Sequence, residues 1–370
     1  MDFAHSDDRQ MLANSLSRYL NDRYPFDTRL AIAGSPEGWS ASQWQALADL
    51  GVTGALFSPD VGGFGGSGFD IAVVFELLGR ALAVEPFLGT AMAGRTLTIA
   101  GGQQALIDAM IAGEAKLAFA HEEPRSRHVL TSIEASATRH GSGWILNGRK
   151  SVVPQLEAAD HILVSSRRDG AAQGTDGISL FLVDAAATGL SVRGYPLIDG
   201  GRGGELSLAD TPAILIAEDG YPIIEEAVAA GIVALCWEAV GILETLRDAT
   251  VDYLRTRRQF GVPIGKFQAL QHRLATVEIE IAQARSSAIN AAGALDGDRH
   301  GRERSASAAK FTIGRVGTLV AEEAIQMHGG IGMTWELPLS HYAKRLIMLG
   351  HQLGDEDHHL ARFAGLRCAE

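Results

Sequence analysis

Residues suited to binding an anionic ligand gather in two segments in the last third of the chain. In the first, Arg257 ends a long helical pattern, Phe260 follows, and Gln268 opens the next helix. In the second, Gln326 precedes the run Gly329-Gly330-Ile331-Gly332. A guanidinium can bind two phosphate oxygens at once, and glycines let backbone amides approach a ligand closely. The two segments predict a site for a phosphate-bearing group.

The arginines at the end of the first segment, and two further runs elsewhere in the chain, have simpler interpretations. Arg255, Arg257 and Arg258 fit a solvated, cationic helix end, where positive charge is favourable. The glycine-rich run 63–68 matches a dinucleotide-binding pattern, but helical patterns flank it and no strand precedes it, so we interpret it as an interhelix loop. The run 355–359 holds acids and histidines, yet neighbouring helix residues point in different directions, so we predict a helix start and no metal site.

The elements that position these residues change in kind along the chain. The first ~115 residues show helical spacing of apolar side chains. Ser40 is the predicted N-cap of one helix, with Gln43 completing a capping box. Trp44 and Leu47 should lie on its buried face. The predicted helices here are 8–21, 41–50, 69–82, 91–100 and 103–111.

From residue 116 short β-rich segments replace the helices. Asn147-Gly148 lies between two of them and is a type I′ hairpin signal. This middle region predicts a small β-barrel or sandwich. The predicted strands are 117–120, 144–146, 150–153, 161–165, 178–183, 205–208 and 213–216.

Helical spacing returns near residue 224 and continues to the end. Long helices with short connections predict a four-helix bundle. The fold class is therefore α+β multidomain, with a helical domain over 1–115, a β domain over 116–222 and a helical bundle over 223–370. The predicted helices of the last domain are 224–256, 267–295, 305–327, 339–349 and 356–363.

Composition excludes several classes of protein. The chain has 370 residues, 46% hydrophobic and 21% charged, which is typical of a globular protein with two or three domains. Its net charge of −12 argues against non-specific nucleic-acid binding. No apolar run reaches the ~20 residues of a membrane span, and the acidic start does not fit a signal peptide. Cys236 and Cys368 are far apart and are expected to be reduced thiols in a cytoplasmic protein.

The motifs and the helix, strand, helix order resemble the acyl-CoA dehydrogenases, FAD-dependent enzymes that desaturate thioesters. The resemblance covers nearly the whole chain and includes Val61–Gly65 and Glu76–Arg80. Gly332–Glu336, His341–Arg345 and the later Leu-Gly-Asp sequence look most like the small subunits of heteromeric members, as in pimeloyl-CoA or steroid side-chain dehydrogenation.

The resemblance implies a role for each motif residue. On the ring side of the flavin the chain departs from the family: Val152 replaces a stacking aromatic and Pro154 a hydrogen-bonding threonine. Of the loop that precedes them, Glu123-Pro124 survives, and Glu122 is a poor neighbour for an anionic reduced flavin. The FAD pyrophosphate and adenine, seated on a neighbouring subunit, would be held by Arg257, Phe260, Gln268, Gln326, Gly329 and Gly330.

The catalytic base is missing from both family positions. In the family a carboxylate removes the α proton of the acyl-CoA while the β hydrogen leaves as hydride to the flavin. The usual position here is Leu353 and the alternate position is Gly231. Glu238, about 10 Å further along the same helix, is one candidate, or else a buried structural acid. Asp355 is the other, or else the N-cap of the next helix.

Three hypotheses follow from the resemblance to a family whose substrates are acyl-CoA thioesters. In the first it is one subunit of a heterotetramer, and a larger homologous chain supplies the base and the ring pocket, with an electron-transfer flavoprotein as acceptor. In the second it is a self-sufficient homo-oligomer with a relocated base. In the third it is a non-catalytic assembly subunit. The acyl group itself cannot be derived from these residues.

Overall fold

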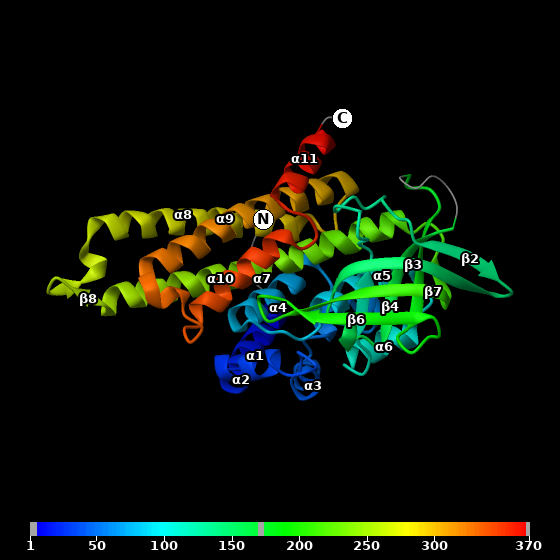
Figure 1. Cartoon of the computed structure of the whole chain (residues 1–370), viewed down its shortest axis with the longest axis horizontal. Helices are drawn as coiled ribbons and strands as arrows, with labels where there is room; N and C mark the ends of the chain where they lie inside the picture. The colour runs from blue at the N-terminus through cyan, green and yellow to red at the C-terminus, as the bar shows by residue number, and fades with distance from the viewer. Residues whose placement is uncertain (1–5, 169–173, 368–370) are drawn as a thin grey trace. The chain divides into compact units, whose positions relative to one another are not determined.

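The computed structural model describes residues 6–168 and 174–367 (Figure 1). By the density of contacts within it, the chain divides into two compact units, and each is described by itself. The first unit comprises Met1–Leu16, Leu30–Ile71 and Val84–Gly231, and the second comprises Ser17–Arg29, Ala72–Ala83 and Ile232–Glu370.

Helices form the N-terminal part, as predicted. Ser40 caps α3, where its hydroxyl accepts a hydrogen bond from the Gln43 N–H at 3.3 Å. Trp44 and Leu47 are buried on that helix, with 2% and 0% exposed. The helix α2 was not predicted, and the glycine-rich run 63–68 is a loop that leads into α4. The helices are α1 (Asp7–Arg23), α2 (Phe26–Ala33), α3 (Ala41–Asp49), α4 (Gly68–Ala81), α5 (Phe87–Ala100) and α6 (Gln104–Ile111).

The middle part is a closed, barrel-like sheet in the first unit. Strand pairing runs β4–β2–β3–β7–β5 and returns to β4, while β1 pairs in parallel with β4 and β6 pairs with β7. Inward-facing apolar side chains such as Leu146, Val164, Phe181 and Leu206 fill its core. The strands are β1 (Leu117–Ala120), β2 (Ser136–His140), β3 (Gly143–Pro154), β4 (His161–Arg167), β5 (Ile178–Asp184), β6 (Leu190–Pro196) and β7 (Arg202–Ala217).

The predicted hairpin at Asn147-Gly148 is wrong. Both segments around it belong to the single strand β3, which pairs with β7 and shifts register between Leu146 and Gly148. The Asn147 amide donates to Asp210 Oδ1 and its Oδ1 accepts from the Asp210 N–H, both at 2.9 Å. These side-chain contacts lie at an irregularity within a continuous ladder, where Gly148 has φ of 148°.

Long helices build the second unit, where α8 and α9 run side by side (Figure 1). Gly79 of α4 packs against α7 so closely that a Cβ there would lie 2.2 Å from the Glu238 carbonyl oxygen. A Cβ on Gly241 would lie 2.0 Å from the Glu76 oxygen, so these two helices cross in direct backbone contact. The helices are α7 (Tyr221–Thr256), α8 (Gln268–Ala294), α9 (Arg299–His328), α10 (Leu339–His351) and α11 (Glu356–Arg367).

The prediction that no segment is long and apolar enough to span a membrane needs correction. Helix α7 is long and apolar enough to pass as a membrane span by length and composition alone. Within its most apolar 18-residue window, however, 94% of the residues are buried inside the protein. We therefore interpret α7 as a core helix. Cys236 lies on it and is buried, whereas Cys368 lies outside the described residues.

Candidate functional site

The six residues predicted to hold a nucleotide lie at one end of the second unit and are all exposed. Arg257 directly follows α7, Gln268 begins α8, Gln326 lies in the last turn of α9, and Gly329-Gly330 open the 3-10 turn η5 (Gly329–Met333). We call this set, with Phe260, the nucleotide edge. The described structure thus joins motifs that are about 60 residues apart in the sequence.

Two contacts hold the ends of these helices together. The rings of Tyr253 on α7 and His328 on α9 stack with their centroids 4.4 Å apart. The Arg273 guanidinium on α8 binds the Glu323 carboxylate on α9 at 2.6 and 2.9 Å. Burial lowers the pKa of His328, whose Nδ1 lies 2.8 Å from the Ala324 carbonyl oxygen. A neutral ring that donates to this carbonyl suits a stacking contact more than a charged one.

A tight hairpin presents Phe260. Strands β8 (Arg258–Gln259) and β9 (Val262–Pro263) pair around Phe260-Gly261, which adopt φ of 52° and 82°. Positive φ at both central residues is the type I′ pattern, and it is strained for a bulky side chain. Phe260 is nevertheless 90% exposed. Strain combined with exposure of an aromatic ring suggests that this tip has a ligand or partner.

The glycines of the nucleotide edge are open to a ligand. Beyond the residues next to it in the chain, no heavy atom of the described structure lies within 4 Å of the Cβ position of Gly329 or of Gly330. Internal packing therefore does not require glycine there, although Gly329 also has φ of 67°. A guanidinium, two carboxamides and accessible backbone are the groups that a dinucleotide needs. The residues present fit the pyrophosphate and adenosine half of FAD.

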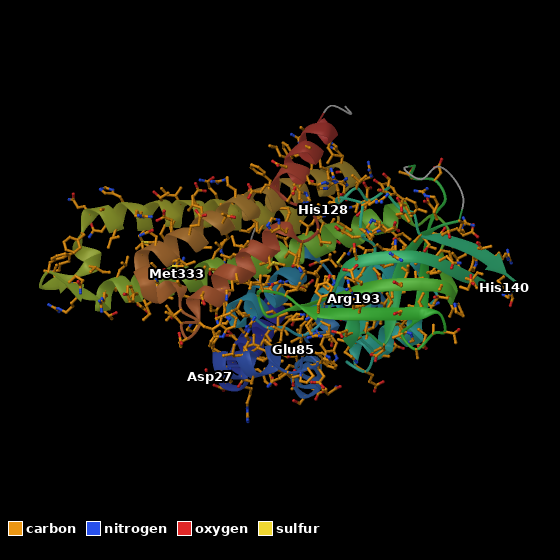
Figure 2. All side chains as sticks on the ribbon, viewed as in Figure 1. Asp27, Glu85, His128, His140, Arg193 and Met333 are labelled. Carbon is orange, nitrogen blue, oxygen red and sulfur yellow. The ribbon has the colours of Figure 1, made fainter. Side chains whose placement is uncertain are left out.

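Exposed apolar side chains follow the two glycines of this edge in the chain. Ile331, Met333 and Trp335 are 48%, 77% and 56% exposed, and Met333 is labelled in Figure 2. The Lys344 ammonium lies 3.7 Å from the Trp335 ring centroid. Exposed apolar side chains close to one another are typical of a surface that another molecule covers.

The region predicted to face the flavin ring lies in the first unit. Val152 adopts φ of 52°, which is exceptional for a β-branched residue, and is 55% exposed at a register shift of β3. Glu122 is hydrogen-bonded to the residue before Val152, because its backbone carbonyl accepts from the Ser151 N–H at 2.9 Å. Its carboxylate contacts His128 Nδ1 at 2.8 Å (Figure 2 labels His128). A contact within the chain thus already engages the carboxylate of Glu122.

A buried polar cluster behind Glu122 was not predicted. Lys150 is 0% exposed, and its ammonium donates to Glu123 Oε1 at 2.7 Å, to Ser165 Oγ at 3.0 Å and to the His121 carbonyl at 3.1 Å. Burial lowers the pKa of Lys150 to about 8, against the charge and hydrogen bond of Glu123. Burial, and then Lys150, lowers the pKa of His121 to about 3. The sequence signal that could have predicted this cluster was a lysine at an inward-facing position of the strand β3.

The segment that replaces the family's usual base is held firmly. Leu353 has φ of 56° and is half-buried. The buried Lys310 ammonium donates to the carbonyls of Gly350 and Gly354 at 2.9 and 2.7 Å. His359 Nε2 contacts the Leu353 carbonyl at 2.9 Å, and burial lowers its pKa to about 3, so the ring is a neutral donor. The backbone is fixed, yet the side chain at 353 cannot accept a proton.

Both candidate carboxylates have structural partners. Arg345 on α10 binds Glu238 through two hydrogen bonds of 2.6 and 2.8 Å, and the two side chains are 17% and 9% exposed. Asp355 Oδ1 accepts from the His358 N–H at 2.9 Å and so caps α11. Gly231, the alternate family position, is buried in α7 and has no side chain to offer.

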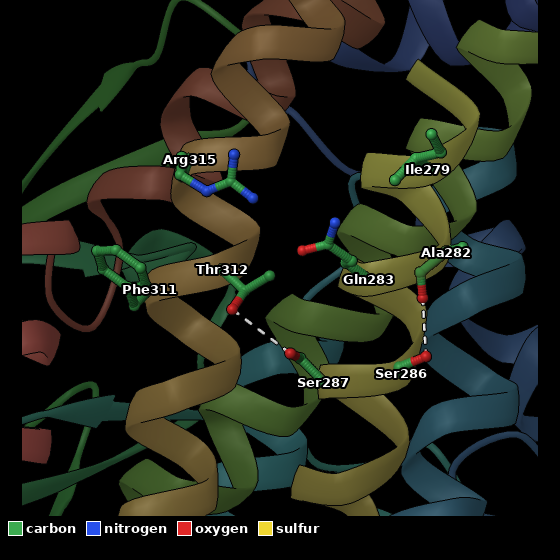
Figure 3. Close-up of a pocket in the computed structure, with 8 residues that line it drawn as sticks. All are labelled: Ile279, Ala282, Gln283, Ser286, Ser287, Phe311, Thr312 and Arg315. Carbon is green, nitrogen blue, oxygen red and sulfur yellow. Dashed lines mark hydrogen bonds between the residues drawn. The ribbon is translucent and has the colours of Figure 1, made fainter. Parts of the chain in front are cut away.

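A separate groove of about 660 Å³ lies between α8 and α9 (Figure 3). Ser287 and Thr312 join across its floor at 3.4 Å, and Ile279, 61% exposed, stands at its rim. None of the predicted site residues lines it. The groove is therefore not part of the nucleotide edge.

The comparisons with known proteins agree with this architecture. Three domain families match in order: the N-terminal domain of acyl-CoA dehydrogenases over residues 6–113, the middle domain over 118–210 and the C-terminal domain over 218–362. The chain belongs to the acyl-CoA dehydrogenase family. These are FAD-linked oxidoreductases that act on CH–CH bonds, so the predicted fold class, enzyme class and cofactor are confirmed at the level of the family.

Several individual proteins are similar over most of their length. Acyl-CoA dehydrogenase IpdE2 of Mycolicibacterium smegmatis is 27% identical over 363 residues, which cover 96% of this chain and 98% of the relative. The 3-(aryl)acrylate reductase of Clostridium sporogenes is 29% identical over 77% of this chain and 79% of its own. Among solved structures, a variant of the steroid dehydrogenase Tcur3481–Tcur3483 has a TM-score of 0.90 at 29% identity, with 98% of each chain covered.

Proposed function

We propose that this chain is one subunit of a heteromeric acyl-CoA dehydrogenase and that its nucleotide edge serves a FAD seated mainly on a homologous partner. The partner would supply the catalytic base and the pocket for the flavin ring. When bound, FAD takes up the hydride that the desaturation of a thioester releases. The residues of this chain would bind and orient the adenosine end.

The carrying observation is the contrast between the two halves of the expected site. The nucleotide edge keeps Arg257, Gln326 and the glycines, all exposed at one end of the second unit. The position of the base keeps its fixed backbone but carries Leu353. A chain that retains the cofactor contacts and lacks the proton acceptor is suited to complete another chain's active site.

The resemblance to heteromeric enzymes supports the proposal. The steroid dehydrogenase Tcur3481–Tcur3483, whose name joins two components, is 29% identical to this chain over nearly its full length. The ChsE4–ChsE5 complex of Mycobacterium tuberculosis has a TM-score of 0.90, although at 24% identity it supports the fold alone.

The self-sufficient alternative needs Glu238 or Asp355 as a base. Arg345 binds both oxygens of Glu238, and Asp355 caps α11. A carboxylate whose two oxygens both accept hydrogen bonds from a guanidinium must first break those bonds before it can reach a substrate proton. These contacts favour structural roles for both residues and leave the base to the partner.

The remaining parts of the proposal follow from the family chemistry. The substrate is an acyl-CoA thioester whose acyl group we leave open, and the electron acceptor is an electron-transfer flavoprotein. We place the assembly, a heterotetramer, in the cytoplasm. Because one relative is named a reductase, assays should follow both desaturation and the reverse reaction.

Arg257→Ala tests the contribution in trans. In the assembled complex we expect FAD to be retained about 10- to 100-fold more weakly, since a hydrogen bond to a charged group contributes roughly 1.5–3 kcal/mol. Arg255→Ala is the matched control, because Arg255 is an exposed cation in the last turn of α7 but not a motif residue. Flavin is counted by absorbance after gel filtration. Equal flavin content in the two variants would rule out the assigned role of Arg257.

A further inference from the structure

Two buried polar side chains of the second unit lie where α9 and α11 pack against each other. Ser307 and His359 are each 1% exposed, and neither Ser307 Oγ nor His359 Nδ1 has a hydrogen-bond partner among the described residues. We call these two side chains the unpartnered pair. Buried polar atoms are seldom left unpaired, because each one has lost its hydration without replacement. The pair therefore needs an explanation.

The contacts on either side place the unpartnered pair on facing surfaces. On α9, Ser307 lies four residues after Glu303 and three before Lys310, so the three share one face. At one end of this face Glu303 Oε2 accepts from the Arg362 guanidinium of α11 at 2.8 Å. At the other end the Lys310 ammonium donates to the Gly354 carbonyl, in the turn before α11, at 2.7 Å. The unpartnered pair lies between these two contacts.

The two unpartnered atoms are complementary as donor and acceptor. Burial lowers the pKa of His359 to about 3, so its ring is neutral. Its Nε2 lies 2.9 Å from the Leu353 carbonyl oxygen and must carry the proton to donate there, which leaves Nδ1 as an acceptor. The Ser307 hydroxyl carries a proton to donate. A group that accepts from the hydroxyl and donates to the ring would satisfy both atoms.

Ser307 does not use the acceptor that other hydroxyls of the neighbouring helices use. Ser286 on α8 and Thr312 on α9 each donate to the carbonyl four residues earlier, at 2.8 Å. The corresponding bond would join Ser307 to the Glu303 carbonyl, and the described structure does not make it. The hydroxyl is therefore available to a group between the helices.

We propose that one water molecule is bound between α9 and α11, where it accepts a hydrogen bond from Ser307 Oγ and donates one to His359 Nδ1. Its second proton suits Gln352 Oε1, a buried acceptor next to Leu353 that has no partner in the described part of the chain. Three bonds are the usual number for a buried water. The water keeps the proton of His359 on Nε2 and so maintains the bond that holds the Leu353 carbonyl. The site does not depend on a heteromer or on a bound flavin.

A high-resolution crystal structure of the full-length chain tests the site directly. We expect one density peak about 2.6–3.2 Å from both Ser307 Oγ and His359 Nδ1. The peak should be lost in Ser307→Ala and kept in Ser340→Ala. Ser340 is the matched control, because it is a buried serine of the same unit whose hydroxyl already donates to the Leu337 carbonyl at 3.3 Å. No peak in the wild type, an unchanged peak in Ser307→Ala, or a direct bond from Ser307 to His359 or to the Glu303 carbonyl would overturn the proposal.

Two measurements in solution test the same site independently. Removal of a hydroxyl without a partner leaves stability unchanged or raises it, whereas removal of one that holds a water leaves Nδ1 of His359 without its donor. We therefore expect the unfolding equilibrium constant, measured in urea, to rise about tenfold in Ser307→Ala. The nitrogen NMR resonance of His359 Nδ1, assigned with His359→Gln, should shift in Ser307→Ala and stay fixed in Ser340→Ala. A resonance that does not move in Ser307→Ala, or a stability that stays the same or rises, would contradict the bound water.

Discussion

Removal of Arg345 tests whether Glu238 is structural or catalytic. Arg345 and Glu238 are joined by hydrogen bonds of 2.6 and 2.8 Å, and their side chains are 17% and 9% exposed. Arg345→Met leaves the carboxylate buried without its partner, which costs about 3–5 kcal/mol of the free energy of unfolding. Since domains are typically stable by only 5–15 kcal/mol, the variant should unfold at much lower urea concentration.

The double variant Glu238→Gln/Arg345→Met separates the two roles. It removes the uncompensated charge, so we expect it to recover about half or more of the lost stability. Unfolding is followed by circular dichroism in urea, and flavin content and turnover are measured in the assembled complex. A structural Glu238 predicts that the folded single variant Glu238→Gln keeps turnover within about tenfold of the wild type, whereas loss of a general base costs roughly 10²–10⁴-fold. A loss below about 1 kcal/mol in Arg345→Met would refute the structural reading of the pair.

Three further predictions concern stability. Burial lowers the pKa of Lys310 from 10.5 to about 8. The unfolded chain therefore binds more protons between these values, and the free energy of unfolding rises with pH. Wild type should gain about 3 kcal/mol relative to Lys310→Met between pH 7.5 and 10.5 in urea unfolding, whereas parallel curves would contradict this. Gly241→Ala should lower the melting temperature, because its Cβ would lie 2.0 Å from the Glu76 oxygen; an unchanged melting temperature would show that α4 and α7 can separate there. Val152→Gly should raise the free energy of unfolding by about 1 kcal/mol, because Val152 has φ of 52°, and a measured decrease would mean that its side chain is stabilising.

The sequence predicted the helical domains well because their signals are long and periodic. The stripe along α7, with Leu235, Ala239 and Ile242, needs no knowledge of distant partners. The short helix α2 was missed, since eight residues give few turns of pattern. The hairpin at Asn147-Gly148 was wrongly predicted for a different reason. The side-chain partner of Asn147 is Asp210, which is 63 residues away and cannot be inferred from local turn preferences.

The candidate site was predicted only in part. The motif residues of the nucleotide edge were identified from type and spacing, and their assignment to FAD remains a prediction. The partners that decide the roles of neighbouring groups were not visible. Arg345 is 107 residues from Glu238, and Lys310 is 44 residues from Gly354. Such long-range pairs depend on how helices pack, which no local pattern specifies. The predicted domain boundaries at 115/116 and 222/223 likewise remain predictions.

The most direct test of the central claim is the flavin content of this chain purified alone and purified with a co-expressed larger homologue. We predict a colourless, folded chain by itself and a yellow complex that turns over an acyl-CoA with an artificial electron acceptor. A preparation of the chain alone that carries one FAD per subunit and oxidises an acyl-CoA unaided would contradict the account.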